Sequence, residues 1–119
     1  MLNNANAENI WRSVREEATQ ASRDEPAMAE LLNDVFLSRK DLFDAVCYRI
    51  SAKLESRSRM NIDFRALFDE AFASDASIRA NVVKDIAAVV ERDAACNSAL
   101  APILYFKGFH AITTHRVAH

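Results

Sequence analysis

The histidines are the first candidates for chemistry in this chain, because an imidazole can bind a metal ion or carry a proton near neutral pH. The three are His110, His115 and His119. The last two stand four residues apart, so a helix would place both rings on one face, where they could share a metal ion. The sequence offers no evident third ligand. We therefore expect no metal site and interpret the histidines as solvated or hydrogen-bonded.

The two cysteines are the second candidates, as nucleophiles or as a disulfide. Cys47 and Cys96 lie far apart in apolar surroundings, and the chain has no C-x-x-C motif. This pattern predicts two buried, reduced thiols. A cysteine–histidine nucleophile is not supported, since nothing in the sequence specifies an oxyanion hole or a third, orienting group.

Charged residues gather at two further places. Glu91, Arg92 and Asp93 form a cluster at the end of an apolar, helix-like pattern. The residues alone favour a helix cap or a surface ion pair, whose contribution is under about 1 kcal/mol. Lys107 beside Gly108 suggests a phosphate site, but no glycine-rich loop surrounds the pair, so we interpret Lys107 as a solvated lysine.

Length and composition indicate one globular domain over residues 1–119, with 50% hydrophobic and 27% charged residues. The formal charge of -2 argues against nucleic acid as a partner. The first residues resemble no signal peptide, and the longest uncharged stretch is interrupted by Asn97, Ser98 and Pro102. We expect a soluble, cytoplasmic chain without a membrane segment.

The elements that must position these groups are predicted to be helices. The chain has 21 alanines, one glycine and two prolines, a composition that favours an all-α fold. Apolar residues recur every three or four positions, which predicts about seven helices. The expected segments are 7–22, 26–36, 42–54, 64–72, 78–90 and 100–117, the last being one kinked helix or two abutting ones.

Local signals predict where these helices start and stop. Pro26 marks one start, Ser38 with Asp41 resembles a capping box, and Asp63 and Asp75 are expected to cap the helices that follow them. Residues 55–62 are predicted to form the main loop. We expect Gly108 to be a left-handed helix cap or a point of close backbone approach. The apolar pattern still runs at residue 119, so we expect the chain to stop within a helix.

A longer pattern resembles a known family. The run DIAAVVERDAACNSALAPILYFKGFHAITTHRVAH at 85–119, with IWRSVREEA at 10–18 and EPAMAELL at 25–32, is similar to the N-terminal α-helical domain of bacterial serine O-acetyltransferases. The resemblance covers almost the whole chain. Ala94 departs from it, because the family usually has proline there. In the family a left-handed β-helix with the catalytic histidine and the coenzyme A site follows, and this chain has no counterpart.

The resemblance implies an enzyme that transfers acetyl from acetyl-CoA to the hydroxyl of L-serine, giving O-acetylserine for cysteine biosynthesis. It places no catalytic residue and no bound cofactor in this chain, which alone should be inactive; acetyl-CoA would be a co-substrate of the full-length enzyme. One substrate residue falls here. Asp93 matches the family's Arg-Asp aspartate, which would hold the ammonium group of serine at the rim of the active site.

The resemblance also implies partners. Family members are commonly hexamers built as dimers of trimers, and some bind O-acetylserine sulfhydrylase through a C-terminal tail that is absent here. We expect this chain to self-associate through its N-terminal helices, where Trp11 is interpreted as a core residue or an interface anchor. The alternative from another class is a free-standing helical interaction module without enzymatic activity.

Overall fold

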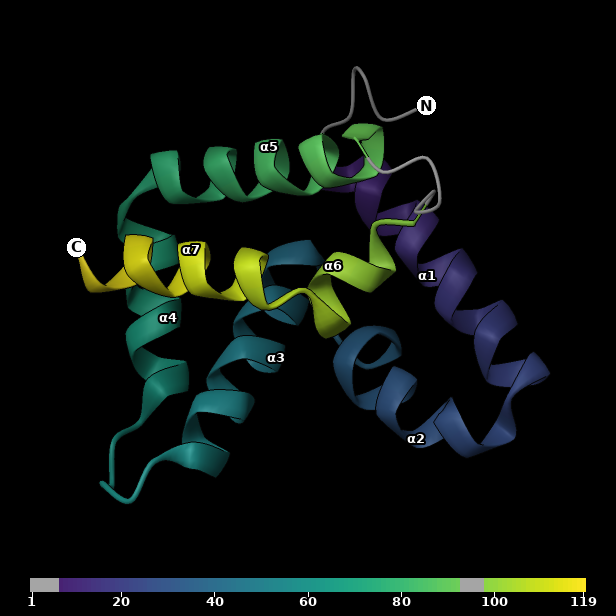
Figure 1. Cartoon of the computed structure of the whole chain (residues 1–119), viewed down its shortest axis with the longest axis horizontal. Coiled ribbons are helices and arrows are strands. Elements are labelled where there is room, and N and C mark those ends of the chain that lie inside the picture. Colours follow the sequence, from purple (N-terminus) through teal and green to yellow (C-terminus); the bar gives the residue numbers. More distant parts are fainter. Residues whose placement is uncertain (1–6, 93–97) are drawn as a thin grey trace.

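The computed structural model describes residues 7–92 and 98–119, and all the regular elements in these two ranges are helical. An all-α fold with about seven helices, as expected from composition and periodicity, is confirmed for this part of the chain (Figure 1). The elements are α1 (Ala7–Asp24), the 3₁₀ turn η1 (Pro26–Met28), α2 (Ala29–Leu32), the π-helical turn η2 (Asn33–Leu37), α3 (Leu42–Arg57), α4 (Phe64–Ser74), α5 (Ala76–Arg92), α6 (Leu100–Tyr105) and α7 (Lys107–Ala118).

Three predicted start signals are confirmed. Pro26 occupies the first turn of η1, where a missing N–H leaves no hydrogen bond unmade. The Asp63 carboxylate accepts a hydrogen bond from the Ala66 amide at 3.0 Å and caps α4. Asp75 accepts from the Ser77 amide at 2.9 Å at the start of α5. The predicted loop begins later than expected, because α3 continues to Arg57.

The capping box predicted at Ser38 is wrong. The cap of α3 is Asp41, whose carboxylate accepts from the Asp44 amide at 2.8 Å, while Asp44 accepts in return from the Lys40 amide at 2.9 Å. Ser38 instead ends η2, donating its own amide to the Asn33 carbonyl at 2.9 Å. Its backbone is near-helical, with φ of -91° and ψ of -3°, and lacks the extended conformation of a typical N-cap.

Both roles predicted for Gly108 are wrong as well. Gly108 lies in the first turn of α7 without a positive φ, and a Cβ added there would meet nothing within 4 Å. The break that separates α6 from α7 is made by Phe106, whose ψ of 106° is extended. Of the two arrangements expected for residues 100–117, the structure has two abutting helices.

The helices pack around one continuous core, with α3 in the middle. One side of α3 meets α1 and η2, and the other meets α4 (Figure 1). α7 packs on α4 and α5, and α6 joins α3 to α5. Burying each large apolar side chain contributes roughly 1.5–3 kcal/mol. The largest fully buried side chains are Phe36, Phe68, Ile10, Leu32, Leu42, Ile86, Ile103, Leu104, Val14, Val35, Val46 and Val82.

Trp11 is half-buried and packs against this core, with the Arg15 guanidinium 5.7 Å from the centre of its ring. It contacts the core without being one of its buried residues, and a role as an interface anchor stays a prediction. Within the two described ranges, no helix combines the length and apolar character needed to cross a membrane.

Candidate functional site

Asp93, the substrate residue predicted from the sequence, lies outside the described residues, together with Ala94 and Cys96. The described residues on either side define where this segment joins the fold. Glu91 and Arg92 are exposed at the last two positions of α5. Ser98 lies just before α6.

Ser98 fastens the start of α6 to α1. Its hydroxyl donates to the Glu17 carboxylate and accepts from the backbone amides of Leu100 and Ala101, at 3.1 and 3.4 Å. The hydroxyl thus satisfies amides that the first turn of a helix otherwise leaves unpaired. Glu17 and Ser98 are 81 residues apart in sequence, so this bond joins α1 to the residues that lead into α6.

The end of α5, which precedes Asp93 in the sequence, is held by an ion pair between α5 and α7. Arg116 donates from Nη1 to Oδ2 of Asp85, and each side chain is 27% exposed. Asp85 stands two helical turns before Arg92 on α5. The end of α5 is therefore fixed relative to α7, as the start of α6 is relative to α1.

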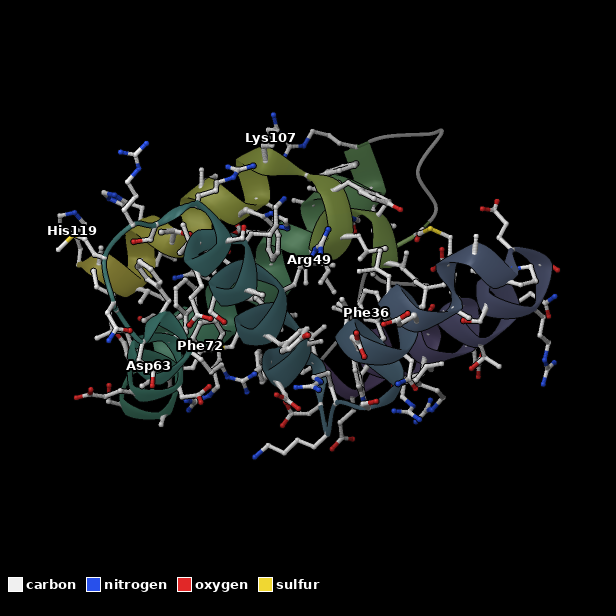
Figure 2. The ribbon with its side chains drawn as sticks, turned by 90° about the horizontal axis from the view of Figure 1, so that it is seen from below. Phe36, Arg49, Asp63, Phe72, Lys107 and His119 are labelled. Carbon is white, nitrogen blue, oxygen red and sulfur yellow. The ribbon has the colours of Figure 1, made fainter. Side chains whose placement is uncertain are left out.

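The junction of α6 and α7 is held by side chains that reach the last carbonyls of α6. Arg49 of α3 donates from Nε and Nη2 to the Leu104 carbonyl at 3.2 and 3.1 Å, and Figure 2 shows its guanidinium beside α6. Nε2 of His110 lies 2.6 Å from the Ile103 carbonyl oxygen. Because a carbonyl only accepts, this geometry assigns the proton to Nε2 and leaves Nδ1 as an acceptor. The Lys53 ammonium lies 3.4 Å from that Nδ1.

His110 is kept neutral by its surroundings. Burial lowers the pKa of its imidazole, and the nearby charges of Lys53 and Arg49 lower it further, against the opposing effect of the hydrogen bond to Ile103. A neutral His110 with its Nε2 proton committed to a backbone carbonyl is a structural element of the junction.

A cavity of about 520 Å³ opens between α3 and α7 beside this junction. We call it the α3–α7 cleft. Its walls carry basic side chains over an apolar floor, and none of the described residues that line it carries a carboxylate. Burial lowers the pKa of Lys53, and the positive charges of Arg49, Arg57 and Lys107 lower it further. The lining residues are Ile50, Lys53, Leu54, Arg57, Lys107, His110, Ala111, Thr114, His115 and Ala118.

The remaining sequence candidates are structural or peripheral. Cys47 is 2% exposed, and burial raises the pKa of its thiol to about 12, so the prediction of a buried thiol is confirmed for this residue. The rings of His115 and His119 lie with centroids 4.4 Å apart. Across the part of the chain that the structure describes, no three potential metal-ligating side chains come together.

Sequence reasoning missed the α3–α7 cleft. One signal was present: Lys53 and Arg57 are four residues apart beside Ile50 and Leu54, which predicts cations next to an apolar helix stripe. No sequence signal could show that Lys107, on a helix about 50 residues further along the chain, would line the same cleft.

Taken together, the described residues define an all-helical domain in which α5 is bonded to α7 through Asp85 and Arg116, and the start of α6 is bonded to α1 through Ser98 and Glu17. Residues 10–114 match the sequence pattern described as "Serine acetyltransferase, N-terminal". The chain therefore belongs to this family, and the resemblance seen in the sequence is confirmed.

Relatives and solved structures agree. The serine acetyltransferase of Haemophilus influenzae is 34% identical over 110 residues, which are 92% of this chain and 41% of that protein. A structure described as serine acetyltransferase in complex with CoA is similar at a TM-score of 0.88 and 33% identity, over 96% of this chain and 48% of that one. A structure of serine acetyltransferase from Neisseria gonorrhoeae in complex with serine is similar at a TM-score of 0.83 and 37% identity. The similarity covers 91% of this chain and 45% of that one. The chain thus spans less than half of these proteins.

Proposed function

We propose that this chain is the helical part of an enzyme that acetylates the hydroxyl of L-serine with acetyl-CoA. The single observation that carries the proposal is the family match over residues 10–114. The similarity to a serine complex and to a CoA complex supports the two substrates. In this reaction a general base takes the hydroxyl proton while the oxygen attacks the thioester carbonyl. The new C–O bond forms, the C–S bond breaks, and coenzyme A leaves as the thiol after gaining a proton.

The groups that perform this chemistry belong, on this proposal, to the part of the enzyme beyond these residues. The chain spans 41% of the Haemophilus influenzae relative, and alone we expect it to be inactive. The first experiment is the intact mass of the natural protein, paired with a serine-dependent assay of coenzyme A release. An active product of about twice 13.3 kDa supports the proposal. An inactive natural product of 13.3 kDa instead favours the free-standing interaction module.

For Asp93 we propose the role implied by the resemblance, holding the ammonium group of serine at the rim of the active site. A carboxylate is suited to this role because it forms charge-assisted hydrogen bonds with an ammonium group. The firm attachment of both flanks supports the proposal, since Arg116 holds α5 and Glu17 holds Ser98.

The test is Asp93→Ala in the full-length enzyme. If serine binding buries the charge pair, we expect kcat/KM for serine to fall by the equivalent of about 2–5 kcal/mol, with acetyl-CoA binding nearly unchanged, because one partner of the pair is lost. Glu91→Ala is the matched control, since Glu91 is an exposed acid two residues away. Unaltered serine kinetics in Asp93→Ala would show that the proposed role is wrong.

Self-association through the N-terminal helices is proposed on the same basis. Trp11 supports it, because it is a large apolar residue of α1 that is only partly buried in this chain. Sedimentation equilibrium across a wide concentration range tests it, and a mass of 13.3 kDa throughout would count against it. The hexamer, the sulfhydrylase partner and the cytoplasmic location stay predictions.

A further inference from the structure

We propose that the α3–α7 cleft binds a small molecule that carries a phosphate or carboxylate group. The proposal goes beyond acetyl transfer, and it rests on cations that converge on this cleft from two helices, with no acid among the described residues that line it.

The register of the two helices creates the convergence. Lys53 and Arg57 are one helical turn apart on α3, so their side chains emerge from the same face. Lys107 begins α7, whose face toward the cleft continues through Ala111 and Thr114. Figure 2 shows Lys107 at the outer edge of this helix. One ligand between α3 and α7 can therefore meet cations from both walls.

These cations lack acidic partners within the described ranges. The ion pairs seen there involve Arg39, Arg65 and Arg116, and none includes Lys53, Arg57 or Lys107. Lys53 is half-buried, and among the described residues its ammonium approaches His110 Nδ1 at 3.4 Å. An ammonium group has three N–H donors, so this single contact leaves donors for an oxyanion.

Burial, and after it the positive charges of Arg49, Arg57 and Lys107, lower the pKa of Lys53, so holding its ammonium group in the cleft costs free energy. An anion in the cleft removes that cost and replaces repulsion by charge-assisted hydrogen bonds. The apolar floor at Ile50 and Leu54 suits the carbon skeleton of an organic acid or phosphate ester, because it can be covered without unpaired polar groups. A volume of about 520 Å³ accommodates a small metabolite.

The test is a titration of the 119-residue chain with inorganic pyrophosphate, followed by backbone amide chemical shifts at constant ionic strength. A parallel titration with succinate distinguishes the phosphate source of the anion from the carboxylate source. We expect saturable shifts at residues 50–57 and 107–118 with at least one of the two probes. Shifts that rise without saturation, or that appear equally on α1, would overturn the proposal.

Matched variants separate a site from general charge attraction. Lys107→Gln should weaken binding about tenfold, because a hydrogen bond to a charged group is lost. Lys84→Gln makes the same charge change at an exposed position of α5 away from the cleft and should weaken binding less than about twofold. Equal weakening by the two variants would show that only net charge matters, and the proposal would fail. Arg57→Gln repeats the test from the other wall and should match Lys107→Gln.

Discussion

The two ends of α3 differ in whether their charged side chains have partners of opposite charge. At its N-terminal end, Asp44 is 12% exposed and accepts from Nη2 of Arg65 at 2.5 Å and from the Lys40 amide at 2.9 Å, with Arg39 at 4.0 Å. At its C-terminal end, Lys53 and Arg57 line the α3–α7 cleft, and no carboxylate is found among the lining residues that the structure describes.

The difference separates charges that hold the fold together from charges that do not. The acid at the N-terminal end joins α3 to α4 and also fixes the turn that precedes α3. The cations at the C-terminal end repel one another, and Lys53 gains little from its neighbours. A cluster that lowers stability while forming the wall of a cavity is suited to binding, since the anion that compensates it comes from outside.

The largest expected effect comes from removing Asp44, the paired acid at the N-terminal end of α3. Asp44→Ala should lower the free energy of unfolding by about 1–3 kcal/mol, because Arg65 and the Lys40 amide both lose a partly buried acceptor. Urea unfolding measures it. Asp69→Ala is the control, since Asp69 pairs with the same arginine at 2.8 Å but is 52% exposed. Its effect should stay under about 0.5 kcal/mol. Equal losses in the two variants would erase the contrast between buried and exposed pairs.

Acidification should weaken two contacts at different pH values: first that of His110 beside Lys53, and only at lower pH those of Asp44. The folded pKa of His110 lies below its usual value of 6.5, so the unfolded chain takes up the proton first, and stability falls as pH drops below 6.5. Burial raises the pKa of Asp44, but the hydrogen bonds from Arg65 and the Lys40 amide and the nearby positive charges outweigh it and lower the pKa from 3.8. Stability from Asp44 should therefore persist until pH falls below 3.8.

His110→Gln tests the first of these windows, because a glutamine can still donate to the Ile103 carbonyl but does not titrate. Urea unfolding between pH 7.5 and 4.5 should show a shallower pH dependence in this variant than in the parent. His119→Gln, at an exposed position, serves as the control. An unchanged slope in His110→Gln would mean that the junction of α6 and α7 does not sense this proton.

The smallest expected effect comes from removing Lys53, one of the cations near the C-terminal end of α3 that pair with no acid among the described residues. Lys53→Met keeps the apolar stem but relieves the repulsion from Arg49, Arg57 and Lys107. We expect the free energy of unfolding, measured without added anion, to stay equal or rise by under about 0.5 kcal/mol. A loss above about 1 kcal/mol would show that the contact with His110 stabilises the fold, and the two ends of α3 would then be alike.

Much of the fold could be predicted from local patterns, and the failures were local too. Within the first predicted helix, 7–22, Ile10, Val14 and Ala18 recur every four residues, and all three are buried. Asp63 and Asp75 cap helices because an acid just before an apolar stripe meets unpaired amides. The prediction at Ser38 failed because η2 extends to it, so the chain was still turning where an extended residue was expected. The prediction at Gly108 failed because a glycine can also occupy an ordinary helical position with open space around it.

The sequence by itself determined the helices and the family, because helical periodicity, caps and a long motif are properties of neighbouring residues. Only the tertiary structure decided which charges meet. Glu17 reaches Ser98 across 81 positions, and Arg49 reaches the Leu104 carbonyl across 55. Lys53 and Lys107 share a cleft for the same reason: electrostatic interactions depend on distance in space, and packing of the apolar faces sets that distance.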